Sequence, residues 1–137
     1  MIVVDASALA KLILREEGWE SVTKHLAAEE SITVDHALKE VLNAVWKAAR
    51  LRGLIDPGLA YEKHRALMLL VEKGVVHVEP EEAYLDDAFR IAMEAGLTVY
   101  DSLYLAQAGR RQAKLLTCDT RQAKAAEEQG IDVVLLA

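Results

Sequence analysis

Four acidic residues stand at points in the chain where a carboxylate can meet a ligand. Asp5 and Asp119 each come at the end of a short apolar run that is typical of a buried strand. If the two runs are neighbouring parallel strands, both carboxylates lie at one edge of the sheet, where ligands bind in such folds. Asp101 lies at the start of a helical pattern, and Glu40 borders the apolar face of another helix. These placements predict one acidic pocket built from distant segments.

Four carboxylates in one pocket would repel one another strongly. At separations of about 5 Å and an effective dielectric constant near 20, each pair costs roughly 3 kcal/mol. A surface salt bridge, at roughly 0–1 kcal/mol, does not offset six such pairs. The cluster is tolerable only if some acids hold protons or if divalent cations bind between them. Oxygen ligands of this kind select Mg²⁺ or Mn²⁺, and substrate phosphates commonly complete such a site.

Each acid also has a purely structural explanation. Asp101 and Asp119 both stand beside helical patterns, where aspartate commonly caps a helix by accepting a backbone N–H hydrogen bond. Glu40 alone would be an ordinary solvated residue on a helix surface. Asp5 is the hardest to explain in this way, because a carboxylate directly after a buried strand is costly without a partner. We also expect Ser7 to cap the helix that follows Asp5.

The elements that must position these acids alternate along the chain. Five short apolar runs predict strands at residues 2–4, 31–34, 75–78, 115–118 and 133–136. Seven helical patterns lie between them, at residues 7–16, 19–28, 36–52, 59–73, 81–95, 102–112 and 121–129. Strands that alternate with helices predict an α/β protein with three α/β/α layers around a central parallel sheet of about five strands.

Composition narrows the class of protein further. With 53% hydrophobic and 28% charged residues, the chain of 137 residues is not disordered, and we expect one domain over residues 1–137. The single cysteine, Cys118, excludes an internal disulfide framework and a cysteine-based zinc site. A net charge of −6 argues against coating nucleic acid by bulk charge. With no basic leader and no long apolar run, we expect a cytoplasmic protein without a membrane segment.

The acids lie within four short motifs that follow one another along most of the chain. The motifs are Val4–Ser7, Glu40–Ala44, Tyr100–Ala106 and Leu116–Arg121, and the chain closes with Gly130–Val133. In their content and order these motifs resemble those of the PIN-domain ribonucleases, and among these the VapC-type toxins of toxin–antitoxin pairs. Each motif is weak alone, but four in order at compatible distances are fairly specific.

The resemblance implies an endoribonuclease with a PIN-like fold that depends on Mg²⁺ or Mn²⁺. The catalytic residues and metal ligands that match the family's acidic quartet are Asp5, Glu40, Asp101 and Asp119. In the family, metal ions at such acids activate a water molecule for in-line cleavage of the phosphodiester bond. Polar side chains that match supporting positions, where they would orient acids, water or phosphate, are Ser7, Asn43 and Thr117.

Substrate and partners must be held outside the quartet. Setting the four acids aside leaves 18 of the 22 acidic side chains against 16 basic ones, so RNA must be held by local basic groups. The basic residues expected to contact RNA are Lys11, Arg15, Arg110, Arg111, Arg121 and Lys124. The resemblance also implies a homodimer and a VapB-like antitoxin protein bound in an apolar groove near the early helices. Trp19 and Trp46 are the candidate exposed anchors for that contact.

Three other classes of protein compete with this interpretation. A receiver-like signalling module also carries acids and Mg²⁺ at strand ends, but it usually has adjacent acids after the first strand and a lysine near Asp119. Here Ala6 follows Asp5, and Thr117-Cys118-Asp119 replaces the lysine. A non-catalytic PIN-like RNA-binding module would have lost a member of the quartet, and none is lost. An aspartyl-nucleophile phosphatase would have a second aspartate where Ser7 stands.

Overall fold

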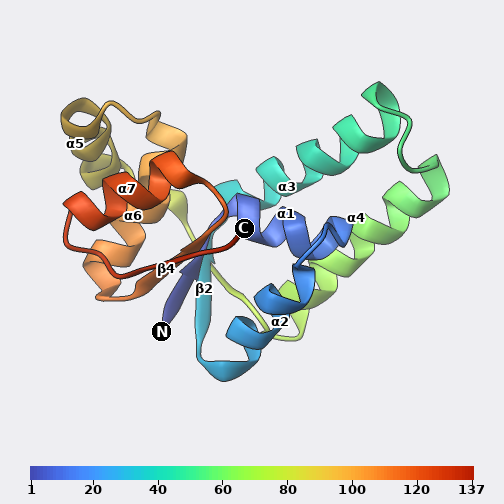
Figure 1. Ribbon diagram of the computed structural model, residues 1–137, viewed down its shortest axis with the longest axis horizontal. Coiled ribbons are helices and arrows are strands. Elements are labelled where there is room, and N and C mark those ends of the chain that lie inside the picture. Colours follow the sequence, from blue (N-terminus) through green and yellow to red (C-terminus); the bar gives the residue numbers. More distant parts are fainter.

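A computed structural model describes all residues from 1 to 137 and places a single five-stranded sheet at the centre of the molecule (Figure 1). All strand pairs are parallel, and the strand order across the sheet is β3-β2-β1-β4-β5. The strands are β1 (Ile2–Val4), β2 (Ser31–Val34), β3 (His77–Glu79), β4 (Lys114–Thr117) and β5 (Val133–Leu135). The predicted α/β class and five-stranded parallel sheet are therefore confirmed.

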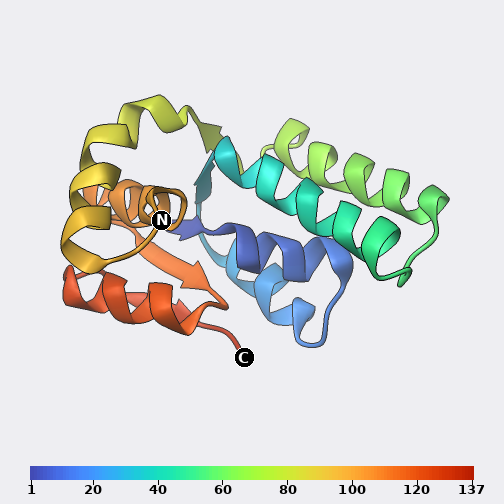
Figure 2. The same ribbon diagram turned by 90° about the horizontal axis from the view of Figure 1, so that it is seen from above.

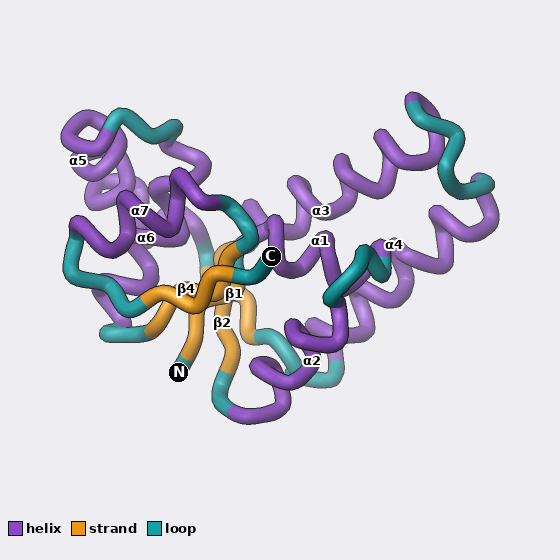
Figure 3. The backbone as a smooth tube through the Cα atoms, in the orientation of Figure 1, coloured by secondary structure: helices purple, strands orange, loops and turns teal.

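Helices cover both faces of this sheet. The helices are α1 (Ala6–Leu14), α2 (Trp19–Ala28), α3 (His36–Trp46), α4 (Pro57–Glu72), α5 (Leu85–Ala95), α6 (Val99–Arg111) and α7 (Thr120–Glu128). Helices α1 to α4 lie on one side of the sheet and α5 to α7 on the other, as both ribbon views show (Figures 1 and 2). The tube view shows the strands between these two groups of helices (Figure 3). None of the helices is long and apolar enough to cross a membrane.

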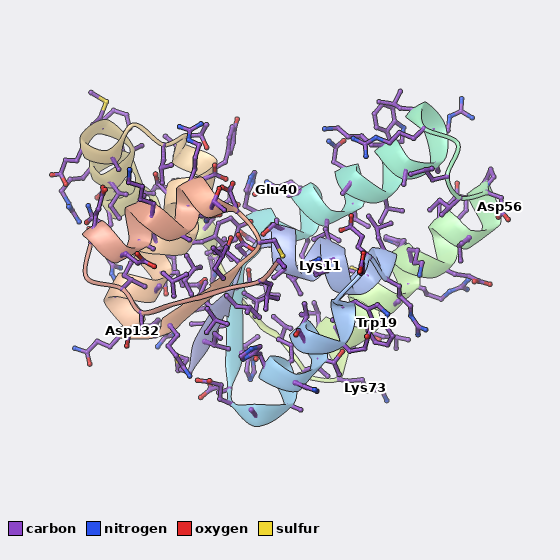
Figure 4. The ribbon with its side chains drawn as sticks, viewed as in Figure 1. Lys11, Trp19, Glu40, Asp56, Lys73 and Asp132 are labelled. Atoms are coloured by element: carbon purple, nitrogen blue, oxygen red, sulfur yellow. The ribbon has the colours of Figure 1, made fainter.

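The element boundaries differ from the predicted ones by three residues or fewer, but two predicted helices are divided. The pattern over residues 36–52 is α3 followed by a π-helical segment, Lys47–Leu51, and the pattern over residues 81–95 is a 3₁₀ turn, Glu81–Tyr84, followed by α5. Helix α3 with its π-helical extension and α4 form a long helical hairpin that projects from the sheet, with Asp56 at its tip (Figure 4).

The central strand β1 is buried on both faces. Its residues Ile2, Val3 and Val4 are fully inaccessible to solvent, which explains why its sequence is continuously apolar and not alternating. Each such side chain stabilises the fold by about 1.5–3 kcal/mol through burial, and these residues belong to one core cluster of 31 buried residues. Val4 pairs with Leu116 of β4, so the two strands end side by side. This register brings the residues after β1 and β4 together.

The first turn of α1 corrects one prediction. Asp5, and not Ser7, is the N-cap of this helix: its carboxylate accepts a hydrogen bond from the N–H group of Ala8 at 2.9 Å. The helix begins at Ala6, so Ser7 already lies inside the first turn and cannot cap it. The cap therefore uses one of the acids that were singled out for chemistry, and the Ser7 hydroxyl is available for other bonds.

A buried polar network ties α6 to the edge strand β3. The amide nitrogen of Gln107 donates to the carbonyl oxygen of Thr33 at 3.0 Å and to Glu79 at 2.9 Å. The Tyr84 hydroxyl also donates to Glu79 at 2.6 Å, and Arg111 binds both oxygens of that carboxylate. These bonds, that of Arg111 foremost, lower the pKa of Glu79 to about 2. The network holds α6 in place, and α6 carries Asp101.

Replacing the buried amide at the centre of this network tests its contribution. We expect Gln107→Leu to lower the free energy of unfolding by about 1–3 kcal/mol, because both hydrogen-bond acceptors lose a buried donor. Urea unfolding followed by circular dichroism measures the change. Gln129→Ala, at the exposed end of α7, is the matched control and should change stability by no more than about 0.5 kcal/mol. Equal losses in both variants would contradict the assignment.

Candidate active site

The four predicted acids line one pocket where β1 and β4 end. This acidic pocket has a volume of about 220 Å³ and lies between the two groups of helices. Its lining residues are Asp5, Ala6, Ser7, Ala10, Glu40, Ala44, Asp101, Tyr104, Asp119 and Gln122. Four helices, α1, α3, α6 and α7, supply these residues together with the N-caps of α1 and α7, so segments more than a hundred residues apart in the chain meet at one place. The convergence that the sequence predicted is present.

Asp5 forms the floor of the acidic pocket and is held by three hydrogen bonds. Only 1% of its surface is exposed. One carboxylate oxygen accepts bonds from the Ser7 hydroxyl at 2.7 Å and from the N–H group of Ala8 at 2.9 Å, and the other accepts a bond from the Thr117 hydroxyl. The Ser7 hydroxyl in turn accepts the N–H group of Cys118 at 2.9 Å. Hydroxyls from the ends of β1 and β4 therefore fix the orientation of one carboxylate.

The electrostatics of the acidic pocket favour either a proton or a cation. Burial raises the pKa of Asp5 to about 6; the hydrogen bonds it accepts oppose this shift, and the negative charge of Asp119 adds to it. The pKa of Asp101 is also raised, first by burial and then by the charge of Asp119. None of Asp5, Asp101 and Asp119 forms a salt bridge. The protein itself thus leaves this negative charge uncompensated.

The helix-cap explanation holds for Asp119 and fails for Asp101. One oxygen of Asp119 accepts the N–H groups of Arg121 and Gln122 at 2.9 and 3.2 Å, so this residue caps α7 and faces the pocket as well. Helix α6 begins earlier than predicted, and Thr98 is its cap, accepting the N–H group of Asp101 at 3.1 Å. The Asp101 carboxylate is therefore not needed as a cap. The Gln122 amide donates to the Asp101 carbonyl oxygen at 3.0 Å and joins the two helix starts.

Glu40 reaches the pocket from the first turns of α3, near the centre of the molecule (Figure 4). Its Oε1 atom accepts a hydrogen bond from the Tyr104 hydroxyl at 2.8 Å and lies 3.0 Å from Nε2 of His36. Burial raises the pKa of Tyr104, and the charge of Glu40 raises it further, so this phenol stays protonated as a donor. Glu40 is thus oriented by one residue of its own helix and one of α6, on the opposite side of the sheet.

Two of the lining residues, Tyr104 and Gln122, were missed by sequence reasoning. Tyr104 lies three positions after Asp101, and Gln122 three positions after Asp119. Residues three apart share a helix face, so this spacing is the signal that could have found both of them. His36, four positions before Glu40, was not among the predicted site residues, although it lies 3.0 Å from that carboxylate.

Of the three predicted supporting polar residues, two contact an acid of the pocket and one does not. Ser7 and Thr117 both bind Asp5, as their predicted supporting role requires. Asn43 is exposed, does not line the acidic pocket and forms no hydrogen bond with Glu40. The structure therefore does not bring Asn43 to an acid of the pocket, because its side chain is exposed to solvent on the surface of α3. Tyr104 and His36 hold Glu40 instead.

Three of the six basic residues lie away from the pocket or are hidden. Lys11 is buried, and its ammonium group donates to the carbonyl oxygen of Glu17 at 2.7 Å, so it is not an exposed contact for RNA. Arg110 and Arg111 lie at the far end of α6, about 14 Å along the helix axis from Asp101. There they pair with acids, Arg110 with Asp87 and Arg111 as described above. These three predictions of substrate contacts are not supported by the geometry.

The other three basic residues are exposed. Arg121 and Lys124 lie on α7 next to the pocket, and the positive charge of Arg121 slightly offsets the raised pKa of Asp101. The Arg121 guanidinium also donates to the carbonyl oxygen of Gly96 at 3.3 Å, in the turn before α6. Arg15, at the end of α1, stacks over the Trp19 ring at 4.8 Å from its centroid. Of these three cations, Arg121 is the one whose charge acts on an acid of the predicted site.

The residues of the acidic pocket fit a divalent cation by their chemistry. Four carboxylates supply hard oxygen donors in a space of about 220 Å³, and the buried carboxylate of Asp5 forms no salt bridge within the protein. No three aspartate, glutamate, histidine or cysteine side chains stand as a ready-made ligand group for a metal ion. A cation would therefore be gathered by rotation of the side chains around the fixed carboxylate of Asp5.

Comparison with known proteins assigns the family. The profile of the PIN domain matches residues 2–128. Ribonuclease VapC3 of Pyrobaculum aerophilum is 40% identical over 124 residues, which cover 90% of this chain and 92% of that protein. Exonuclease VapC9 of the same organism is 36% identical over 135 residues, covering 98% and 91%. The chain therefore belongs to the PIN-domain family, and its relatives within that family are VapC nucleases.

Solved structures agree with this assignment. The crystal structure of PAE2754 from Pyrobaculum aerophilum superimposes with a TM-score of 0.68 at 28% identity, covering 97% of this chain and 88% of that one. A toxin–antitoxin complex from Klebsiella pneumoniae contains a chain with the same fold, with a TM-score of 0.65 at 15% identity and 90% of both chains covered. The alternative of a receiver-like signalling module is therefore wrong.

The raised pKa of Asp5 predicts a measurable dependence of stability on pH. The folded protein holds a proton on Asp5 up to pH of about 6, whereas the unfolded chain releases it near pH 3.8. Folding stability from this group is thus present at low pH and lost as the pH rises from about 4 to 6, by on the order of 3 kcal/mol. In EDTA we expect Asp5→Asn to unfold at a higher temperature than the wild type at pH 7.5, and at a similar temperature at pH 4.

Metal binding should reverse the order of the two unfolding temperatures at pH 7.5, so that the wild type becomes more stable than Asp5→Asn. Added Mg²⁺ or Mn²⁺ should raise the melting temperature of the wild type at pH 7.5 and raise that of Asp5→Asn much less, because the variant lacks the negative charge of the one carboxylate that is buried at the floor of the pocket. Asp132→Asn, on the exposed loop before β5, is the control and should follow the wild type under all conditions. A wild type that is unaffected by metal and as stable as Asp5→Asn at pH 7.5 would refute the assignment.

Proposed function

We propose that this protein is a ribonuclease that cleaves RNA internally with Mg²⁺ or Mn²⁺ bound among Asp5, Glu40, Asp101 and Asp119. The observation that carries the proposal is the meeting of these four carboxylates in one pocket, with no cation of the protein paired to three of them. Membership of the PIN-domain family and the VapC ribonuclease among its relatives support it. A non-catalytic PIN-like module is disfavoured because no member of the acidic quartet is missing.

The protein contributes orientation and charge to this reaction. A bound divalent cation supplies a positive charge that lowers the pKa of a water molecule and offsets the charge of the phosphate. Ser7 and Thr117 hold Asp5 in one orientation, and Tyr104 holds Glu40, so these acids need little reorganisation when the substrate arrives. Attack of the water on phosphorus with departure of the 3′ oxygen gives products with 5′-phosphate and 3′-hydroxyl ends.

RNA must approach this negative pocket with local help from basic groups. Arg121 and Lys124 on α7 are the exposed cations beside it, and we assign the phosphates that flank the cut to them. Few such contacts imply binding that weakens as salt concentration rises, with a shallow dependence. We propose single-stranded RNA as the substrate.

The cleavage assay should distinguish internal from end-directed cleavage, since one relative is named a ribonuclease and another an exonuclease. A circular single-stranded RNA has no ends, so only an endonuclease opens it. We expect the purified protein to linearise such a circle with Mg²⁺ or Mn²⁺ and to leave it intact in EDTA. Asp101→Asn should lower the rate by about 100-fold or more, since losing even the outer partners of metal ligands costs 10–100-fold.

The matched control for this assay is Asp86→Asn, which removes an exposed carboxylate from α5 on the other side of α6. It should cleave at the rate of the wild type. Cleavage of linear RNA only would show that the protein is an exonuclease. Full activity of Asp101→Asn, or activity that persists in EDTA, would reject the proposed site.

We further propose that the protein is a homodimer and the toxin of a pair with a VapB-like antitoxin. The apolar groove between α3 and α4 on the projecting hairpin supports an antitoxin segment as its occupant. Its volume is about 490 Å³, and its lining residues are Leu42, Val45, Trp46, Ala49, Arg50, Pro57, Ala60, Tyr61 and His64. Trp46 and Tyr61 are 50% and 72% exposed. Trp19 is partly covered by Arg15, so Trp46 is the stronger anchor of the two predicted.

Coexpression with the product of the reading frame next to this gene tests the antitoxin proposal. We expect the two proteins to purify together, and Trp46→Asp to weaken the complex by roughly 30-fold or more, as loss of a central aromatic anchor does. Met93→Asp, an equally polar change at an exposed apolar residue of α5, should not weaken it. Light scattering of the protein alone gives its mass, and a monomer would reject the homodimer. Copurification unaffected by Trp46→Asp would reject the groove.

A further inference from the structure

Two aromatic rings are stacked at the rim of the acidic pocket. The rings of His36, at the start of α3, and Tyr100, in the first turn of α6, lie nearly parallel, with 4.9 Å between centroids and 11° between planes. His36 is mostly buried, whereas Tyr100 is 60% exposed. The Tyr100 ring is thus backed by the imidazole on one face and open to solvent elsewhere. Neither the core nor the proposed chemistry explains this pair.

This ring pair adjoins two of the four acids directly. Tyr100 is the residue before Asp101, and His36 lies 3.0 Å from the Glu40 carboxylate through Nε2. The other imidazole nitrogen, Nδ1, faces Glu81 at 3.9 Å, so carboxylates on both sides limit rotation of the ring. Because His36 is held in this way, the Tyr100 ring rests on a fixed support. The ring therefore lies next to the acidic pocket, within reach of a nucleotide whose phosphate is bound there.

We propose that the open face of Tyr100, supported by His36, stacks with one unpaired nucleobase of the RNA strand, next to the phosphate at the acidic pocket. The proposal rests on the ribonuclease function proposed above and adds a base-binding subsite to it. Every base has a flat aromatic face, so the subsite selects for a base that is unpaired and unstacked more than for its identity. The ring pair would thus favour cleavage within single-stranded segments.

The surroundings of the ring pair favour a nucleic acid over an apolar protein segment. Exposed cations lie on both sides: Lys39, 3.7 Å from Glu81, on the α3 side, and Arg121, near Asp101, on the α7 side. The apolar groove assigned to the antitoxin is elsewhere, on the hairpin, and does not include Tyr100. A single aromatic face flanked by cations and a proposed metal site matches a nucleotide, with its flat base and charged phosphate.

A combination of protein variants and abasic substrates tests the proposal. Short single-stranded RNAs carry one abasic residue at each position near the cut in turn, and kcat/KM is measured for the wild type, Tyr100→Leu and Tyr100→Phe. At one position we expect base removal to lower kcat/KM of the wild type by roughly 5- to 150-fold, the range for loss of one base–aromatic stack. Tyr100→Leu should lower kcat/KM on intact RNA by a similar factor.

The combination of Tyr100→Leu with the RNA that lacks one base is the decisive measurement. On the RNA that lacks the base in question, Tyr100→Leu should be no slower than the wild type, since the stack is already absent. Tyr100→Phe keeps the ring and should behave as the wild type. Phe89→Leu, at an exposed aromatic residue of α5, is the matched control and should have no effect on any RNA. Tyr100 is exposed, so these variants should fold, and circular dichroism checks this.

The outcomes separate this inference from the proposed function. Cleavage by the wild type with no effect of Tyr100→Leu on any substrate overturns the subsite and leaves the ribonuclease intact. Effects of Tyr100→Leu that are equal with and without every base also overturn it, since a structural role would give that result. If the wild type cleaves no RNA, the proposed function fails, and a 5-iodouridine RNA that does not photocrosslink to Tyr100 overturns the subsite as well. Loss of antitoxin binding alone in Tyr100→Leu would show that the ring binds protein.

Discussion

The repulsion among carboxylates at the ends of β1 and β4 is the constraint on which the site depends. Asp5 lies directly after a strand that is buried on both faces, and its charge has hydroxyl and amide partners but no cation. Burial is the main cause of the raised pKa values of Asp5 and Asp101, and the negative charge of Asp119 raises both further. A fold with this arrangement sacrifices stability to keep a place for an external positive charge.

Glu79 differs from Asp5 because its negative charge is paired with a cation of the protein itself. Glu79 is bound by Arg111, Tyr84 and Gln107, and its pKa is lowered to about 2. Nothing remains for a ligand to add there, and the residue serves to hold α6 against β3. The comparison with Asp5 gives a physical criterion: a buried acid that is fully paired within the protein is structural, whereas one that lacks a cation is a candidate for function.

Sequence patterns predicted most of the fold because short buried strands and capped helices leave local signals. They also predicted the four acids, since each follows or borders an element whose direction is fixed by the parallel sheet. The partners of those acids were harder to predict, because contacts across the sheet have no local signal: Tyr104 on α6 reaches Glu40 on α3. Asn43 was expected there instead, and a small error in rotation about the α3 axis is enough to place a side chain in solvent. Arg110 and Arg111 were expected to contact RNA because they lie on the same helix as Asp101. They lie at the opposite end of that helix, away from the pocket.

The order of strands across the sheet also has a consequence for biosynthesis. Strand β4 inserts beside β1, although about 110 residues of chain separate them. Asp119, the last of the four acids of the pocket, follows β4. A growing polypeptide that has not yet delivered this segment lacks both the Thr117 hydroxyl that orients Asp5 and the carboxylate of Asp119. The proposed site is therefore assembled only after the C-terminal region has left the ribosome and joined the sheet.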